Sequence, residues 1–385
     1  MTTYVILKLI WWVLLGVLMA SIGLMVGMDM GVGILLNFIG RTGDERGTIL
    51  RAIDPHWEGN QTWFILGGGA VFAAFPTLYG TSFSVFYVVM ILLLFSMILR
   101  PLGFGYRDQV NSARWRTIWD WTLFISGFLP MFVFGAAFGN VMEGVGYHFT
   151  WTGQYVQDEC FLSYLLNPFA ILCGLISVAL AIQGGAAILM VDTVDPIYAR
   201  ARKFGVPAGL IAAVLFVLGG FWVGHIKGFV ATKVTPDMPA NPLLHGQEAV
   251  MRMGALLEHF HANPILWAIP AVGILGMVLT SLFMMANKPG LGWWCGVLTW
   301  FGVIGTVGTA MFPFLMPSFT NPNQSLTLWN ATGSEYGLIG MLIAAAITLP
   351  VVFAYTGWSF WVMRGKVQPV TGEDGSGNGS LSGGY

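Results

Sequence analysis

The chain has 385 residues, of which 56% are hydrophobic and only 9% are charged, and its formal net charge is -1 at pH 7. Its mean hydropathy is +0.73. Soluble domains carry about 25% charged residues, so this composition excludes a soluble globular protein and indicates a membrane protein with several spans. The balanced charge gives no indication of a nucleic-acid partner.

Apolar segments of about 20 residues predict nine membrane-spanning helices. The first covers Leu9–Phe38. Two more lie between Glu58 and Arg100, with the turn at Pro76 and Gly80. The remaining segments run from Asp120 to just before Glu143, within Leu162–Val191, within Phe204–Ile226, within Pro264–Ala286, from Pro289 to near Met316, and from Tyr336 to Val362. We therefore expect an all-α integral membrane protein.

Domain organisation follows from these spans. Residues 1–364 are expected to form a single polytopic membrane domain. The segment 227–263 is the only loop long enough for local structure, and we expect it on the outside. Residues 365–385 are rich in Gly and Ser, so we expect a disordered tail.

Basic residues predict the orientation, because cytoplasmic loops are enriched in Lys and Arg. Of the 17 basic residues, 13 fall on one side of the nine predicted spans. They are Arg41, Arg46, Arg51, Arg100, Arg107, Arg114, Arg116, Arg200, Arg202, Lys203, Lys288, Arg364 and Lys366. This distribution predicts an N-terminus outside and a C-terminus in the cytoplasm.

Asp29 stands out because it interrupts the first apolar segment, where an ionised carboxylate is costly and usually functional. Gly23, Gly27 and Gly31 form a stripe of small residues that favours close helix packing. At 3.6 residues per turn Asp29 points about 200° away from Gly27 and Gly31, and it lies about 10–15 Å inside the cytoplasmic end. We interpret it as a proton-handling carboxylate. The alternative is a structural ion pair, for instance with Arg100.

Glu58 and Asp120 are two further acids on the same side, and each is expected to open a helix. A carboxylate is stabilised at a helix N-terminus, so an ordinary first-turn role is the alternative to a functional one. Metal ligands are not expected. None of the six histidines lies in the middle of a predicted helix, and the cysteines Cys160, Cys173 and Cys295 form no CxxC pair.

A run of motifs, in order, resembles subunit II of cytochrome bd-type quinol oxidases over about residues 4–364. The motifs are "GMDMGVG", "PHWEGNQTW", "AVFAAFPTLY", "RPLGFGYR", "RWRTIWDW", "AFGNVMEGV", "NPILWAIPA" and "MFPFLMPS…SLTLWNAT". The resemblance implies a multi-pass subunit in the bacterial inner membrane. It also implies a homologous subunit I carrying haem b and haem d, and a small single-helix peptide in some complexes. The complex would oxidise quinol outside and reduce O2 to water with cytoplasmic protons.

The resemblance also assigns roles to particular residues. It implies that this subunit binds no haem, supports assembly and conducts protons through Asp29 and Glu58. Trp57, Arg100 and Asp120 are expected around the head group of a structural ubiquinone. Val26 departs from the family, which often has a second Asp at this position.

Two alternatives remain open beside the oxidase subunit. The first is a proton-coupled secondary transporter, which an intramembrane Asp and the helix-breaking Pro270 and Pro313 would suit. The second is a scaffold subunit whose acids serve only assembly.

Overall fold

The computed structural model describes residues 2–158, 167–239, 241, 243 and 247–367. Eight of the described helices are long and apolar enough to cross a membrane. A ninth span is made by α2 with α3, which are bent by 118° relative to each other. The prediction of an all-α membrane fold with about nine spans is therefore confirmed for the described residues. The predicted tail lies outside them from residue 368 onwards.

In the described part of the chain, nine long helices build the bundle, with α3 (Pro76–Val85) at the turn between two of them. They are α1 (Thr3–Ile39), α2 (Gly43–Ala74), α4 (Tyr87–Tyr106), α5 (Ala113–Glu143), α7 (Pro168–Asp192), α8 (Ile197–Val223), α10 (Ala268–Met285), α11 (Pro289–Met311) and α12 (Glu335–Val362). Several begin with an N-cap side chain or a first-turn proline, as Thr42 and Pro168 illustrate.

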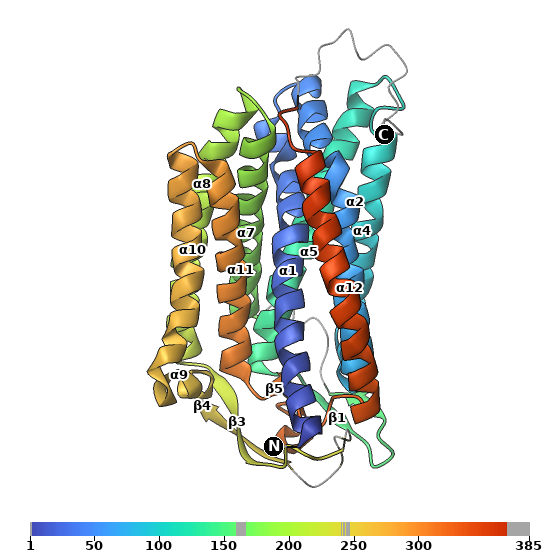
Figure 1. Cartoon of the computed structure of the whole chain (residues 1–385), viewed down its shortest axis with the longest axis vertical. Coiled ribbons are helices and arrows are strands. Elements are labelled where there is room, and N and C mark those ends of the chain that lie inside the picture. The colour runs from blue at the N-terminus through green and yellow to red at the C-terminus, as the bar shows by residue number, and fades with distance from the viewer. Residues whose placement is uncertain (1, 159–166, 240, 242, 244–246, 368–385) are drawn as a thin grey trace.

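Eight of the described helices form two groups of four that meet along α1 and α5, both of which pack against α7 (Figure 1). One group contains α1, α2, α4 and α5, and the other contains α7, α8, α10 and α11. Helix α1 packs against α2, α5, α7 and α11. Helix α12 lies at the periphery against α2 and α1, and Leu338 is its only buried residue.

The glycine stripe on α1 is the face of close packing, as predicted. A Cβ atom on Gly31 would collide with the backbone of Ala181 on α7, and one on Gly185 would lie 2.5 Å from the carbonyl carbon of Gly31. Gly23 faces the ring of Trp300 on α11 in the same way. These contacts leave the opposite face of α1 for Asp29.

Two predicted helix starts were wrong. Helix α2 begins at Gly43, 15 residues before Glu58, and its first-turn acids are Asp44 and Glu45. Helix α5 begins at Ala113, and its first turn has no acid. Glu58 and Asp120 therefore lie inside helices, and the dipole of a helix N-terminus does not account for either. Helix α11 also ends earlier than predicted, at Met311.

Among the described residues, three short strand pairs lie at the end of the bundle where α1 begins (Figure 1). They are β1 (Tyr147–Phe149) with β2 (Tyr155–Gln157), β3 (Lys227–Val234) with β4 (Gln247–Met253), and β5 (Phe314–Met316) with β6 (Leu326–Thr327). The pair β3–β4 and the short helix α9 (Glu258–Ala262) come from the predicted long loop.

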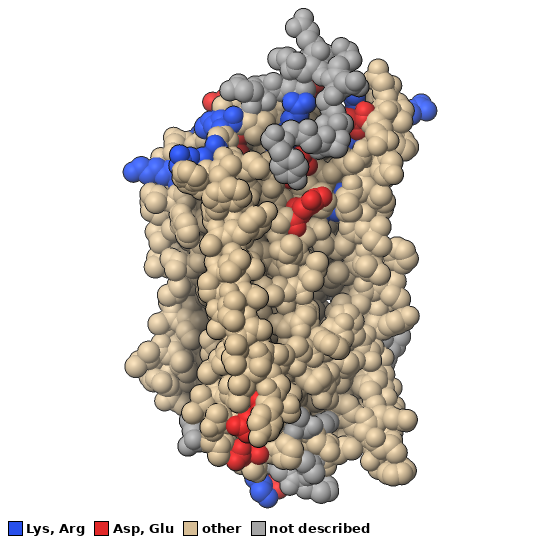
Figure 2. Space-filling model, turned by 45° about the vertical axis from the view of Figure 1, so that its right-hand side comes forward, with Lys and Arg blue, Asp and Glu red and all other residues tan. Residues whose placement is uncertain are grey.

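Charge is concentrated at the ends of the molecule. Figure 2 shows Lys and Arg gathered mainly at the end opposite the strand pairs, with a broad uncharged band across the middle of this face. The start of α1 and the end of α12 lie at opposite ends of the bundle in Figure 1. An odd number of spans requires this arrangement.

Candidate functional site

Asp29 lies on α1, ten residues before the last residue of the helix, and its side chain is only 1% exposed. Asn60 on α2 donates a hydrogen bond from Nδ2 to Asp29 Oδ2 at 2.9 Å. The site is about 15 Å from the end of α1 at 1.5 Å per residue. The bundle therefore holds a carboxylate deep inside the protein with a donor from a neighbouring helix.

Arg100 on α4 shares this interior, since its side chain is 3% exposed. Its Nη1 lies 2.8 Å from the sulfur of Met30. Asp29 and Arg100 both line a small cavity among α1, α2, α4 and α5, together with Ser126. The cavity volume is about 10 Å³, which is the lower limit for holding one water molecule. A direct Asp29–Arg100 ion pair is not among the ion pairs of the described residues.

Glu58 is exposed, whereas Asn60, two residues later on α2, is buried. Positions two apart point about 200° from each other on a helix. Glu58 therefore lies on the outward face of α2, away from the face that meets Asp29. The structure places the two predicted proton carriers on neighbouring helices without bringing their side chains together.

Trp57 and Arg100 do lie side by side. The Trp57 ring stacks on Phe104 with centroids 4.9 Å apart, and the Arg100 guanidinium carbon lies 5.9 Å from the Trp57 ring. The indole Nε1 of Trp57 donates to Asp54 at 3.3 Å. This arrangement offers an aromatic face beside a buried cation.

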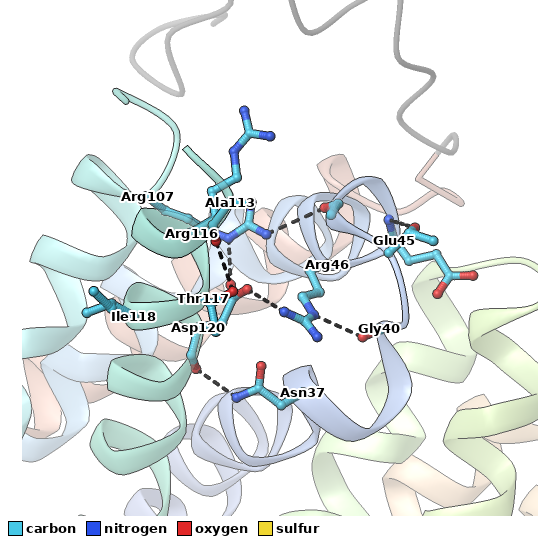
Figure 3. A network of polar contacts seen from close by, with 12 residues as sticks. Asn37, Gly40, Glu45, Arg46, Arg107, Ala113, Arg116, Thr117, Ile118 and Asp120 are labelled. Carbon is cyan, nitrogen blue, oxygen red and sulfur yellow. Dashed lines mark hydrogen bonds and ion pairs between the residues drawn. The ribbon is translucent and has the colours of Figure 1, made fainter. Parts of the chain in front are cut away.

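Asp120 belongs to a different cluster, at the charged end of the bundle (Figure 3). Its Oδ2 lies 2.8 Å from Arg46 Nη1 and its Oδ1 lies 2.6 Å from Arg107 Nε. The side chain of Asn37 also donates to the backbone carbonyl of Asp120 at 3.1 Å. These contacts join α1, α2, α4 and α5. The expected grouping of Asp120 with Trp57 and Arg100 is therefore not observed, because both oxygens of Asp120 pair with other arginines.

A quinone head group fits this set only in part. Trp57 and Arg100 could supply a ring contact and a donor to a quinone carbonyl. Asp120 is already paired with Arg46 and Arg107. The cavity that Arg100 lines has a volume of only about 10 Å³. A ring-sized ligand would need space that this cavity does not provide.

Two buried polar groups in the structure were not predicted from the sequence. Asn60 was not predicted as the partner of Asp29. Lys8 is fully buried and donates to the carbonyls of Pro236, Met238 and Trp329 at 3.2, 2.9 and 2.8 Å.

The expectation that no histidine lies in the middle of a helix was wrong for His56. It sits within α2, 8% exposed, and its ring stacks on Phe360 at 4.2 Å. The cause is the early start of α2, which carries the helix well beyond its apolar part. Among the described residues, no group of three or more His, Cys, Asp or Glu could hold a metal ion.

The fold and this interior define a class: a polytopic helical membrane protein with a buried carboxylate, a buried arginine and a small cavity between four helices. The sequence profile of the cytochrome bd terminal oxidase subunit II family matches residues 7–363. The chain belongs to this family and is a transmembrane subunit of a cytochrome bd-type quinol oxidase. Membership implies a partner subunit I and haems in the complex.

Individual relatives agree over nearly the whole chain. The chain is 42% identical to "Cytochrome bd-I ubiquinol oxidase subunit 2" of Escherichia coli K12, over 95% of this chain and 97% of that protein. It is 41% identical to "Probable cytochrome oxidase subunit 2" of Haemophilus influenzae, with the same coverage. The fold matches a chain of the bd oxidase from Geobacillus thermodenitrificans with a TM-score of 0.68 and 13% identity, over 93% of this chain and 98% of that chain.

Proposed function

We propose that this chain conducts cytoplasmic protons through Asp29 towards O2-reducing haems in subunit I, and that it binds no haem itself. The observation that carries the proposal is the buried Asp29 carboxylate, which accepts a hydrogen bond from Asn60 and lies beside a cavity of about 10 Å³. A carboxylate can take a proton from water and pass it on, and a bound water can bridge a gap between carriers. A purely structural acid would be expected to be fully paired, as Asp120 is.

Glu58 is the second carrier in this proposal. It lies 15 residues into α2 and faces outward, at a depth similar to that of Asn60 and Asp29. A carboxylate facing lipid at that depth is costly. The cost is removed if the outward face of α2 contacts the partner subunit or water there. We infer that protons reach Glu58 from the cytoplasm along this contact and pass around α2 to the cavity.

The proposed orientation in the membrane rests on the end of the bundle where most Lys and Arg residues lie. We propose that the end holding Arg46, Arg107 and most other basic residues is cytoplasmic, with the N-terminus outside in the bacterial inner membrane. The complex would contain the homologous subunit I with haem b and haem d, and in some cases a small single-helix subunit. Quinol, O2 and lipid are its other ligands.

A structural ubiquinone is a separate proposal. It is supported by the neighbouring Trp57 and Arg100 alone, since Asp120 lies in the charged cluster. No step of the proton route depends on it.

Purification tests the assignment against the proton-coupled transporter. The chain should co-purify with a second membrane subunit in a complex that shows haem absorbance and consumes O2 when given quinol. A chain that purifies alone, shows no haem absorbance and takes up a solute against a proton gradient would support the transporter instead. A complex with normal O2 reduction when both Asp29 and Glu58 are neutralised would leave only the scaffold role.

A further inference from the structure

We propose that Asn60 is a positioning residue for Asp29: its amide holds Oδ2 as an acceptor, so that the transferred proton binds and leaves through Oδ1. This inference rests on the proposed proton route through Asp29. It adds a residue that does not carry the proton but decides which oxygen does.

The two oxygens of Asp29 have different surroundings. Oδ2 accepts the hydrogen bond from Asn60 Nδ2 at 2.9 Å. No described residue donates a hydrogen bond to Oδ1. Asp29 also lines the small cavity that Arg100 and Ser126 line. An amide NH2 is only a donor, so a proton placed on Oδ2 would face another hydrogen. Oδ1 is therefore the oxygen that can gain and lose a proton.

Packing of α2 against α1 holds Asn60 in place. Asn60 is 2% exposed, and Trp63, one turn away, is also 2% exposed. Two turns on, a Cβ atom on Gly67 would lie 2.5 Å from Ile22 Cδ1 of α1, so the two helices are in close contact there. This contact leaves the amide little freedom to move away from Asp29.

Asn140 shows what a buried asparagine does without such a partner. It is 3% exposed on α5, and its Nδ2 donates to the backbone carbonyl of Ala136 in the same helix at 2.9 Å. Asn60 instead uses its donor on a carboxylate of another helix. A hydrogen bond to a charged group contributes more than one to a neutral carbonyl, so the Asn60 contact is the stronger constraint.

The chemical step is a proton transfer with no change in electrons. Oδ1 takes H⁺ from a protonated water that reaches Asp29, which leaves neutral water and a neutral carboxylic acid. The acid then releases the same H⁺ to the next acceptor and returns to the carboxylate. Throughout, Asn60 keeps its hydrogen bond to Oδ2, so the carboxyl group does not rotate between the two steps.

The test uses the purified oxidase complex and quinol-driven O2 consumption. Asn60→Leu removes the donor, Asn60→Asp keeps the shape without a donor when ionised, and Asn140→Leu is the matched control for losing a buried asparagine. We expect both Asn60 variants to turn over about tenfold more slowly than the control, which corresponds to about 1.4 kcal/mol. Haem absorbance should match the control, showing that the complexes are assembled.

A double variant separates positioning from a structural role. If Asn60 acts through Asp29, Asn60→Leu combined with Asp29→Asn should be no slower than Asp29→Asn alone. Additive slowing would overturn the inference, as would Asn60→Leu turnover equal to that of Asn140→Leu. Normal turnover of Asp29→Asn itself would instead overturn the proposed proton route, so the two failures are distinguishable.

Discussion

Asp120 Oδ1 and Arg107 Nε lie 2.6 Å apart, with side chains that are 1% and 2% exposed. Arg46, which is 23% exposed, pairs with the other oxygen. This ion-paired cluster closes the charged end of the four-helix group that contains Asp29. Its position indicates that the cluster holds α1, α2, α4 and α5 together rather than carrying protons.

Removing Arg107 should therefore lower stability. In Arg107→Met, Asp120 keeps only the more exposed Arg46, and breaking a buried pair costs on the order of 3 kcal/mol. We expect a clear drop in the melting temperature of the purified complex. Arg114→Met, at an exposed arginine in the first turn of α5, is the control and should stay within about 0.5 kcal/mol of the parent. Equal melting temperatures for the two variants would show that the pair does not stabilise the bundle.

A second prediction concerns the stability contributed by Lys8, which lies at the opposite end of the bundle. Lys8→Met leaves the buried carbonyls of Met238 and Trp329 without their donor, at a cost of about 1–3 kcal/mol each, and also frees the more exposed carbonyl of Pro236. Lys233→Met is the control, because Lys233 is 66% exposed and its pair with Glu248 spans 3.6 Å. Thermal unfolding should show a large loss for Lys8→Met and almost none for Lys233→Met. A similar small loss in both would mean that other donors replace the ammonium.

Replacing Glu58 should slow O2 consumption less than replacing Asp29. If water reaches the outward face of α2, as the proposed route requires, it can replace a lost carboxylate there, so Glu58→Gln should slow O2 consumption by less than Asp29→Asn does. Glu248→Gln, a carboxylate that is 62% exposed at the far end, should leave the rate unchanged. If Glu58→Gln slows turnover more than Asp29→Asn, the order of the two carriers is reversed.

The quinone proposal predicts a change in composition. If a head group packs on Trp57, Trp57→Ala should lower the quinone extracted per haem from the purified complex. Trp121→Ala, at a tryptophan that is 49% exposed, should not. An unchanged quinone content in Trp57→Ala would mean that Trp57 binds no quinone and only stacks on Phe104.

The spans and the two faces of α1 were predictable, because apolar length and the spacing of Gly23, Gly27 and Gly31 reflect local periodicity. The starts of α2 and α5 were not. Their first turns are polar and extend beyond the apolar segment, so hydropathy located only the part of each helix within the apolar band. His56 was misplaced for the same reason.

The partners of the buried charges could not be predicted from the sequence either. Asp120 has arginines before and after it in the chain, and only the three-dimensional crossing of α2, α4 and α5 selects Arg46 and Arg107. Asn60 looks like one polar residue among several in "EGNQT". Its role follows from the close α1–α2 contact and not from its neighbours in sequence.

The most direct test of the proton route is the O2 consumption rate of the Asp29→Asn complex with quinol as donor. Asn keeps the shape of Asp but cannot carry a proton. The rate should therefore fall by at least about tenfold while haem absorbance and assembly stay normal, since proton-transfer groups contribute about 10²–10⁴-fold. Asp29→Glu should retain part of the activity, and Asp44→Asn, an exposed acid in the first turn of α2, should retain all of it. A fully assembled Asp29→Asn complex that turns over at the parent rate would contradict the proposed proton route through Asp29.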